Sequence, residues 1–192
     1  MKITEVIDVE RPAIQVWDLF QDVPSLAACL PGASLTQDKG GGVYAGAVGV
    51  KLGPMSATFE GEATVASDAA SRSGTVNGKG VDRRGGSVGQ VKVAYALEET
   101  DRGTRVTIDA DVILSGAAAQ FGRTGLIKEM SGRLIDEFVA CVEAKLTAET
   151  KEEAAVITAG EVKGFSLFFS SLLASIVRFV KGILGGRGRG SG

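Results

Sequence analysis

Apolar and polar residues alternate through most of the chain between residues 34 and 114, and clusters of glycine and charged residues interrupt the alternation. A period of two residues is the signature of β-strands, and such clusters are typical of the turns that join them. We expect a first strand at Lys2–Val9 and others at about 34–38, 43–52, 55–65, 72–80, 87–97 and 104–114. Each has one apolar and one polar face, which is typical of an antiparallel sheet covered on one side.

Three helical segments accompany these strands. Pro12 begins the first, since proline is tolerated in the first helical turn, and the stretch Asp22-Val23-Pro24-Ser25 ends it and caps a second helix that runs to Cys29. The third extends from about residue 117 to 150 and carries an apolar stripe. The stripe consists of Ile127, Met130, Leu134, Ile135, Phe138, Cys141 and Val142. This order is the α+β helix-grip arrangement, in which a curved antiparallel sheet wraps a long C-terminal helix.

The inward face of the expected sheet contains several very small residues. They are Gly46, Ala57, Gly61, Gly78 and Gly80. Gly122, Gly125 and Gly132 weaken the first half of the long helix, by about 1 kcal/mol each relative to alanine. Small residues opposite a loosened helix predict an apolar ligand cavity, and the alternative is that the glycines permit the sheet to coil.

The expected ligand-binding residues combine large and small inward positions of the sheet with one side of the long helix. They are Tyr44, Val48, Ala57, Phe59, Gly61, Val93, Tyr95, Ile108, Phe121, Ile127, Met130 and Leu134. For the two tyrosines the alternative is a buried hydroxyl that bonds the backbone. For the residues of the helix the alternative is ordinary core packing.

Residues 164–192 form a separate part. On a helix, their large apolar side chains gather on one side, and Arg178, Lys181, Arg187 and Arg189 without any acid give a charge of +4. The other 17 basic residues stand against 23 acids, so the rest of the chain carries −6. A cationic, phenylalanine-rich amphipathic helix is typical of a segment that lies on an anionic membrane surface. The expected membrane-binding residues are Phe165, Phe168, Phe169, Leu172, Leu173, Ile176, Phe179, Val180, Ile183, Arg178 and Lys181.

Three other interpretations of this tail are open: docking into a groove of a partner protein, a transmembrane span, and packing back onto the body. Arg178 and Lys181 inside the segment disfavour the span. We expect a folded domain at residues 1–148, a linker at 149–163 and the tail at 164–192.

The chain contains no histidine, which excludes Ser-His-Asp and Cys-His catalysis and histidine-based metal sites. Cys29 and Cys141 are far apart and belong to no C-x-x-C pair, so we expect buried thiols in a reducing compartment. The N-terminus lacks the apolar stretch of a signal peptide, which favours the cytoplasm. Neither a metal nor a covalent cofactor is expected.

Two other features have a plain interpretation. The carboxylate pairs Glu60/Glu62 and Asp109/Asp111 alternate with apolar residues, so they are expected to face solvent rather than to act as an acid and a base. The sequence Arg-Gly-Arg at 187–189 is common in nucleic-acid-binding tails, but two arginines on an acidic protein give little affinity. No nucleic acid partner is expected.

Several short stretches together are similar to one family. They are VWDLFQD at 16–22, LAACLPG at 26–32, VKLGP at 50–54, FEG at 59–61, GKG at 78–80, GTR at 103–105 and AQFG at 119–122. They resemble the CoxG family, which is named for carbon monoxide dehydrogenase, and the resemblance covers about residues 1–146. This family belongs to the SRPBCC, or START-like, superfamily of hydrophobic-ligand binders.

The resemblance implies a non-catalytic accessory protein that attaches the aerobic molybdenum CO dehydrogenase to the inner face of the cytoplasmic membrane. Electrons from that enzyme must reach a quinone in the bilayer, so a START-like cavity on a membrane-bound body suits a carrier of menaquinone or ubiquinone. The implied partners are the enzyme, the membrane surface and an isoprenoid quinone. The alternatives are an assembly or maturation factor without a ligand, and a polyketide cyclase-like enzyme, which needs an acid or base inside the cavity.

Overall fold

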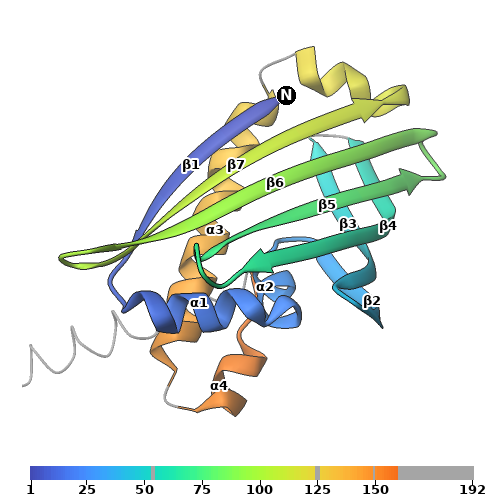
Figure 1. Ribbon diagram of the computed structural model, residues 1–192. Coiled ribbons are helices and arrows are strands. Elements are labelled where there is room, and N and C mark those ends of the chain that lie inside the picture. Colours follow the sequence, from blue (N-terminus) through green and yellow to red (C-terminus); the bar gives the residue numbers. More distant parts are fainter. Residues whose placement is uncertain (53–54, 124–125, 149, 160–192) are drawn as a thin grey trace, which may run out of the picture.

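The computed structural model describes residues 1–52, 55–123, 126–148 and 150–159 (Figure 1). The strands are β1 (Lys2–Val9), β2 (Ala33–Gly40), β3 (Val43–Leu52), β4 (Met55–Asp68), β5 (Ser73–Asp82), β6 (Ser87–Thr100) and β7 (Gly103–Ser115). The helical elements are α1 (Ala13–Gln21), α2 (Val23–Cys29), the 3₁₀ segment η1 (Gly116–Arg123), α3 (Leu126–Thr147) and α4 (Lys151–Val156). This order confirms the α+β helix-grip fold that the alternation predicts.

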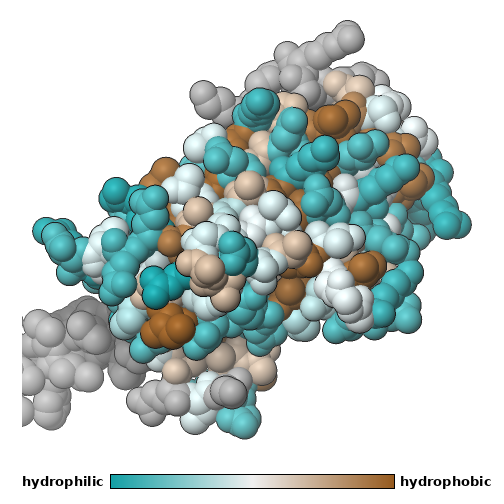
Figure 2. Space-filling model, in the orientation of Figure 1, coloured by the Kyte–Doolittle hydropathy of each residue, from teal (hydrophilic) through white to brown (hydrophobic). Residues whose placement is uncertain are grey.

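The strands form one antiparallel sheet in the order β1-β7-β6-β5-β4-β3-β2. Consecutive strands from β2 to β7 pair as hairpins, and β1 joins the far side by pairing with β7 from Lys2↔Asp111 to Val9↔Thr104. Helix α3 runs behind the sheet (Figure 1). The face of the sheet turned away from α3 is largely hydrophilic, with scattered apolar spots (Figure 2). The sheet therefore has the single covered face that alternation requires.

The core lies where α1 packs on β6 and β7. Helix α1 buries Ala13, Val16, Trp17 and Phe20, the spacing of one helix face. These side chains meet a set of buried residues on the sheet. That set is Val9, Tyr95, Leu97 and Val106.

Helix α2 follows α1 directly because Asp22 caps it. The two carboxylate oxygens of Asp22 accept hydrogen bonds from the backbone N–H of Ser25 at 3.1 Å and from its hydroxyl at 2.8 Å. The cap satisfies a donor that the first helical turn leaves open. The chain thus turns between α1 and α2, and Cys29 is placed at the end of α2 with its side chain fully buried.

The expected single helix from residue 117 to 150 was wrong in one respect. The structure divides it into η1, which ends at Arg123, and α3, which begins at Leu126. Gly122 and Gly125 flank the division, and glycine is a weak helix former because it loses the most backbone entropy. The segment expected to be a linker contains the short helix α4.

Candidate functional site

The concave face of the sheet can be traced from strand to strand by register, because directly opposite residues of an antiparallel pair share one face. Tyr95 is buried against α1, and its row continues through Ile108 on β7 and Gly74 on β5. Further rows of the same face are apolar or glycine. They are Val65–Val76–Val93–Ala110 and Tyr44–Ala63–Gly78–Val91–Val112. The helices therefore lie over an apolar surface that spans β3 to β7.

Away from α1 this surface is only half-buried. Tyr44, Ala57, Phe59 and Val93 are half-buried, and Val48 is 43% exposed. On β2, Leu35 lies opposite Gly46 and is 40% exposed. The concave face is thus closed under α1 and open near β2 and β3, where apolar side chains remain accessible to an apolar ligand.

Two of the small inward residues do not face empty space. A Cβ atom at Gly61 would collide with the backbone oxygen of Lys79, and one at Gly46 would collide with that of Ser34. Glycine is needed at these positions because neighbouring backbone approaches closely. The expectation that they leave room for a ligand was therefore wrong at both, and the alternative of a tightly coiled sheet holds there.

Phe59 lies over two other glycines of the face. A Cβ atom at Gly80 would lie 3.0 Å from Cβ of Phe59, and one at Gly89 would lie 3.3 Å from its ring. The missing side chains thus make room for an aromatic ring of the protein itself. Gly78 is similar, since a Cβ atom there would lie 2.9 Å from Cγ1 of Val91.

The structure places Tyr95 and Ile108 in or beside the core rather than at the open part of the face. The ring of Tyr95 lies 5.2 Å from that of Phe20 and covers Gly74. Its buried hydroxyl has no hydrogen-bond partner among the described residues. Burial raises the pKa of the Tyr95 phenol, and the side chain of Gln21 partly opposes this shift.

On α3, Leu134 is 38% exposed. The side chains of Phe121, Ile127 and Met130, and the whole membrane-binding set from Phe165 to Ile183, lie outside the described residues. Within the described part, no helix is both long and apolar enough to cross a bilayer.

The carboxylate pairs on the strands have structural partners. Glu62 forms an ion pair with Lys39, and Asp109 accepts a hydrogen bond of 2.6 Å from the hydroxyl of Thr4. Asp111 pairs with the N-terminal amine at 3.3 Å. No group of three or more potential metal ligands occurs among the residues that the structure describes.

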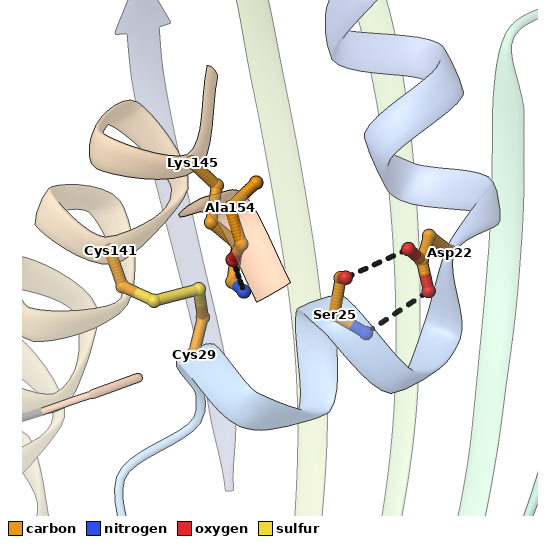
Figure 3. The surroundings of a disulfide bond; sticks show 6 residues. All are labelled: Asp22, Ser25, Cys29, Cys141, Lys145 and Ala154. Atoms are coloured by element: carbon orange, nitrogen blue, oxygen red, sulfur yellow. Dashed lines mark hydrogen bonds between the residues drawn. A yellow bond between two sulfur atoms is a disulfide. The ribbon is translucent and has the colours of Figure 1, made fainter. Parts of the chain in front are cut away.

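Cys29 and Cys141 form a disulfide, so the expectation of two buried thiols was wrong (Figure 3). The bond joins α2 to α3, with Cα atoms 5.4 Å apart. Both residues were expected on buried helical positions, which was the available signal. Their separation of 112 residues gave no indication that the two helices meet.

The segment that contains α4 covers this disulfide. The Nζ atom of Lys145 donates a 2.6 Å hydrogen bond to the carbonyl oxygen of Ala154, and the N–H of Ala159 donates one of 2.9 Å to that of Ala28. Ile157 packs against the cluster of Cys29 and Cys141. Burial lowers the pKa of Lys145, and its attraction to Asp22 opposes the shift. We call residues 150–159 the clasp.

These features define a class of protein: a helix-grip, START-like domain whose sheet offers an apolar concave face. Solved structures with this fold include a conserved protein from Geobacillus kaustophilus, which is 17% identical with a TM-score of 0.66, over 76% of this chain and 95% of that one. Another is the Zhui aromatase/cyclase from Streptomyces sp. R1128, which is 15% identical with a TM-score of 0.54, over 77% of this chain and 96% of that one. Such low identities show the fold alone.

The sequence identifies the family within that class. Residues 6–147 match the model of the carbon monoxide dehydrogenase family CoxG, so the chain belongs to the CoxG family. Membership implies an accessory role alongside CO dehydrogenase. No curated protein matches the chain.

Proposed function

We propose that this protein is a non-catalytic accessory protein that recruits molybdenum CO dehydrogenase to the inner face of the cytoplasmic membrane and binds an isoprenoid quinone on its concave face. The half-buried apolar face near β2 and β3 carries the proposal. An isoprenoid chain is long and apolar, and about 25 cal/mol is gained per Å² of apolar surface removed from water. Family membership supports the enzyme as partner, and the cationic apolar tail supports the membrane.

A cyclase-like enzyme has less support. Among the described residues, the strand carboxylates that were weighed as catalytic groups lie on the outer face and have structural partners. Tyr95 is the inward polar group that sequence reasoning singled out, and it lies in the core with Phe20.

Organic extraction of the purified full chain, followed by mass spectrometry, tests the proposal. We expect a co-purifying isoprenoid quinone in the wild type and its loss in Ala57→Phe, which adds a ring to the half-buried inward face. Thr58→Phe is the matched control, because Thr58 is the next residue on β4 and is exposed. Equal ligand in both variants would place the site elsewhere. A wild type that binds the enzyme without any isoprenoid would indicate an assembly factor.

A further inference from the structure

A groove of about 420 Å³ lies between strand β1 and helix α3. Its walls are residues 5–8 of β1 and one side of α3. The residues of α3 are Ile135, Asp136, Val139, Ala140 and Glu143. Figure 1 shows β1 at the edge of the sheet with α3 behind it. The groove is separate from the open part of the concave face near β2 and β3.

Strand β1 leaves this groove with an unpaired edge. β1 ends the sheet and pairs with β7 alone among the described strands. In such a strand, alternate N–H and C=O groups point away from the sheet, and an edge of this kind accepts another extended segment. Val6 on this strand is 55% exposed. The edge therefore has free backbone groups next to an apolar floor.

The charge of the groove is negative. Glu5 interrupts an inward face that otherwise holds Ile3, Ile7 and Val9. Glu5, Asp136 and Glu143 form no ion pair in the described part of the chain, whereas Asp8 is paired with Arg105 at 2.8 Å. The nearest cation at the far end is Arg11, which donates to the backbone oxygens of Glu10 and Leu146 and to the hydroxyl of Thr147.

These charges indicate the chemistry of the occupant. A second copy that added its own β1 here would bring its carboxylates against these ones, which is unfavourable. A basic extended segment would compensate them. In an extended segment, residues i and i+2 lie on one face, so a segment with basic residues at alternate positions presents both cations to the groove.

We propose that the groove binds the C-terminal end of this same chain, Arg187-Gly188-Arg189-Gly190, as an added strand beside β1. Both arginines then face Glu5, Asp136 and Glu143, and the glycines place no side chain on the other face. Arginine suits the role because its planar guanidinium binds carboxylates in pairs of hydrogen bonds.

The attachment of the tail favours this contact. Ala159 is hydrogen-bonded to Ala28, next to the disulfide, and Cys141 of that disulfide lies two residues before Glu143 on α3. The groove extends about 12 Å along α3 at 1.5 Å per residue, and residues 160–186 are far longer than this when extended. A tether of this kind gives an effective concentration of about 1 mM.

The contact has a consequence for the tail. Arg187 and Arg189 also belong to the cationic segment expected on anionic lipid, so the groove and an anionic membrane compete for the same two side chains. The groove contact itself does not depend on membrane or quinone binding, and it is tested without lipid.

Hydrogen exchange of the full chain at low ionic strength tests the proposal. Amides of β1 are expected to exchange about threefold to tenfold more slowly in the wild type than in Arg187→Ser/Arg189→Ser, the range given by two exposed ion pairs. About 0.5 M salt should remove the difference, since it screens exposed charges. The groove variant Glu5→Gln/Asp136→Asn/Glu143→Gln should lose the same protection, and the arginine substitutions should then have no further effect.

Glu60→Gln/Glu98→Gln/Glu152→Gln is the control, because it removes three exposed charges outside the groove. Equal exchange of β1 in the wild type and the arginine variant at low salt overturns the proposal. A difference that disappears on dilution also overturns it, because the tail would then come from a second copy. Loss of protection in the control variant would do the same, since the effect would then be one of net charge.

Discussion

The Cys29–Cys141 disulfide is expected to contribute about 3–5 kcal/mol to the free energy of unfolding. It connects residues that are 112 apart in sequence. In the chain-entropy model, a closed loop of this length corresponds to about 4.8 kcal/mol at 25 °C, and measured disulfides typically contribute about 2–4 kcal/mol. Both cysteines are fully buried, so their replacement by alanine also removes packed sulfur atoms, which adds a smaller loss.

The assay is thermal and urea unfolding of the wild type and of Cys29→Ala/Cys141→Ala, with and without dithiothreitol. The double variant should melt about 6–20 °C lower, given about 2–4 °C per kcal/mol for a chain of this size. Dithiothreitol should lower the melting temperature of the wild type toward that of the variant and leave the variant unchanged. Two free thiols in denatured, unreduced wild type, or equal melting of the two proteins, would refute the reasoning.

Three further predictions concern other parts of the chain. Tyr95→Phe should raise the free energy of unfolding by about 1 kcal/mol in urea titrations, because it removes a buried hydroxyl without a partner. It should also reduce the loss of stability above pH 10, because burial raises the pKa of the Tyr95 phenol and the unfolded chain therefore loses this proton first; an unchanged pH profile would contradict this. A chain that ends at Ala159 should keep its disulfide resistant to dithiothreitol without denaturant, whereas a chain that ends at Ala148 lacks Ile157 and should be reduced faster; equal thiol release would show that the clasp does not protect the bond. Phe168→Asp/Leu172→Asp should release the full chain from anionic liposomes in a sedimentation assay, while the control Ser170→Asp/Ser171→Asp, with the same charge change on the expected polar side, should retain more binding; sedimentation of the first variant would favour a protein groove as the tail's target.

The strands were predictable because their signal is local. The alternation that ends near residue 114 reflects which side of each strand is covered, and the expected buried stripe of α1 is buried in the structure. The boundaries are less well determined, since β4 and β6 extend to Asp68 and Thr100. Strand ends depend on pairing with a neighbour, which the sequence of one strand does not contain.

The features that were missed depend on distances between segments far apart in the chain. Gly61 can be a ligand-lining residue or a contact for neighbouring backbone, and only the position of Lys79 decides between these. The disulfide likewise depends on how α2 meets α3. The clasp was expected as a bland linker because its anchors are two backbone carbonyl oxygens, which no side-chain pattern reveals.

The clasp also connects the two halves of the proposed function. Ala159 is bonded to Ala28 in α2, and the N–H of Gly49 on β3 donates a 2.8 Å hydrogen bond to Gly32, three residues after Cys29. The tail therefore leaves the body on the side where the concave face is open and where Leu30 is 48% exposed. Residues 160–163 span at most about 14 Å when extended. A tail that lies on a membrane would thus hold this side close to the lipid, and an apolar ligand could pass from the bilayer to the open face without crossing much water.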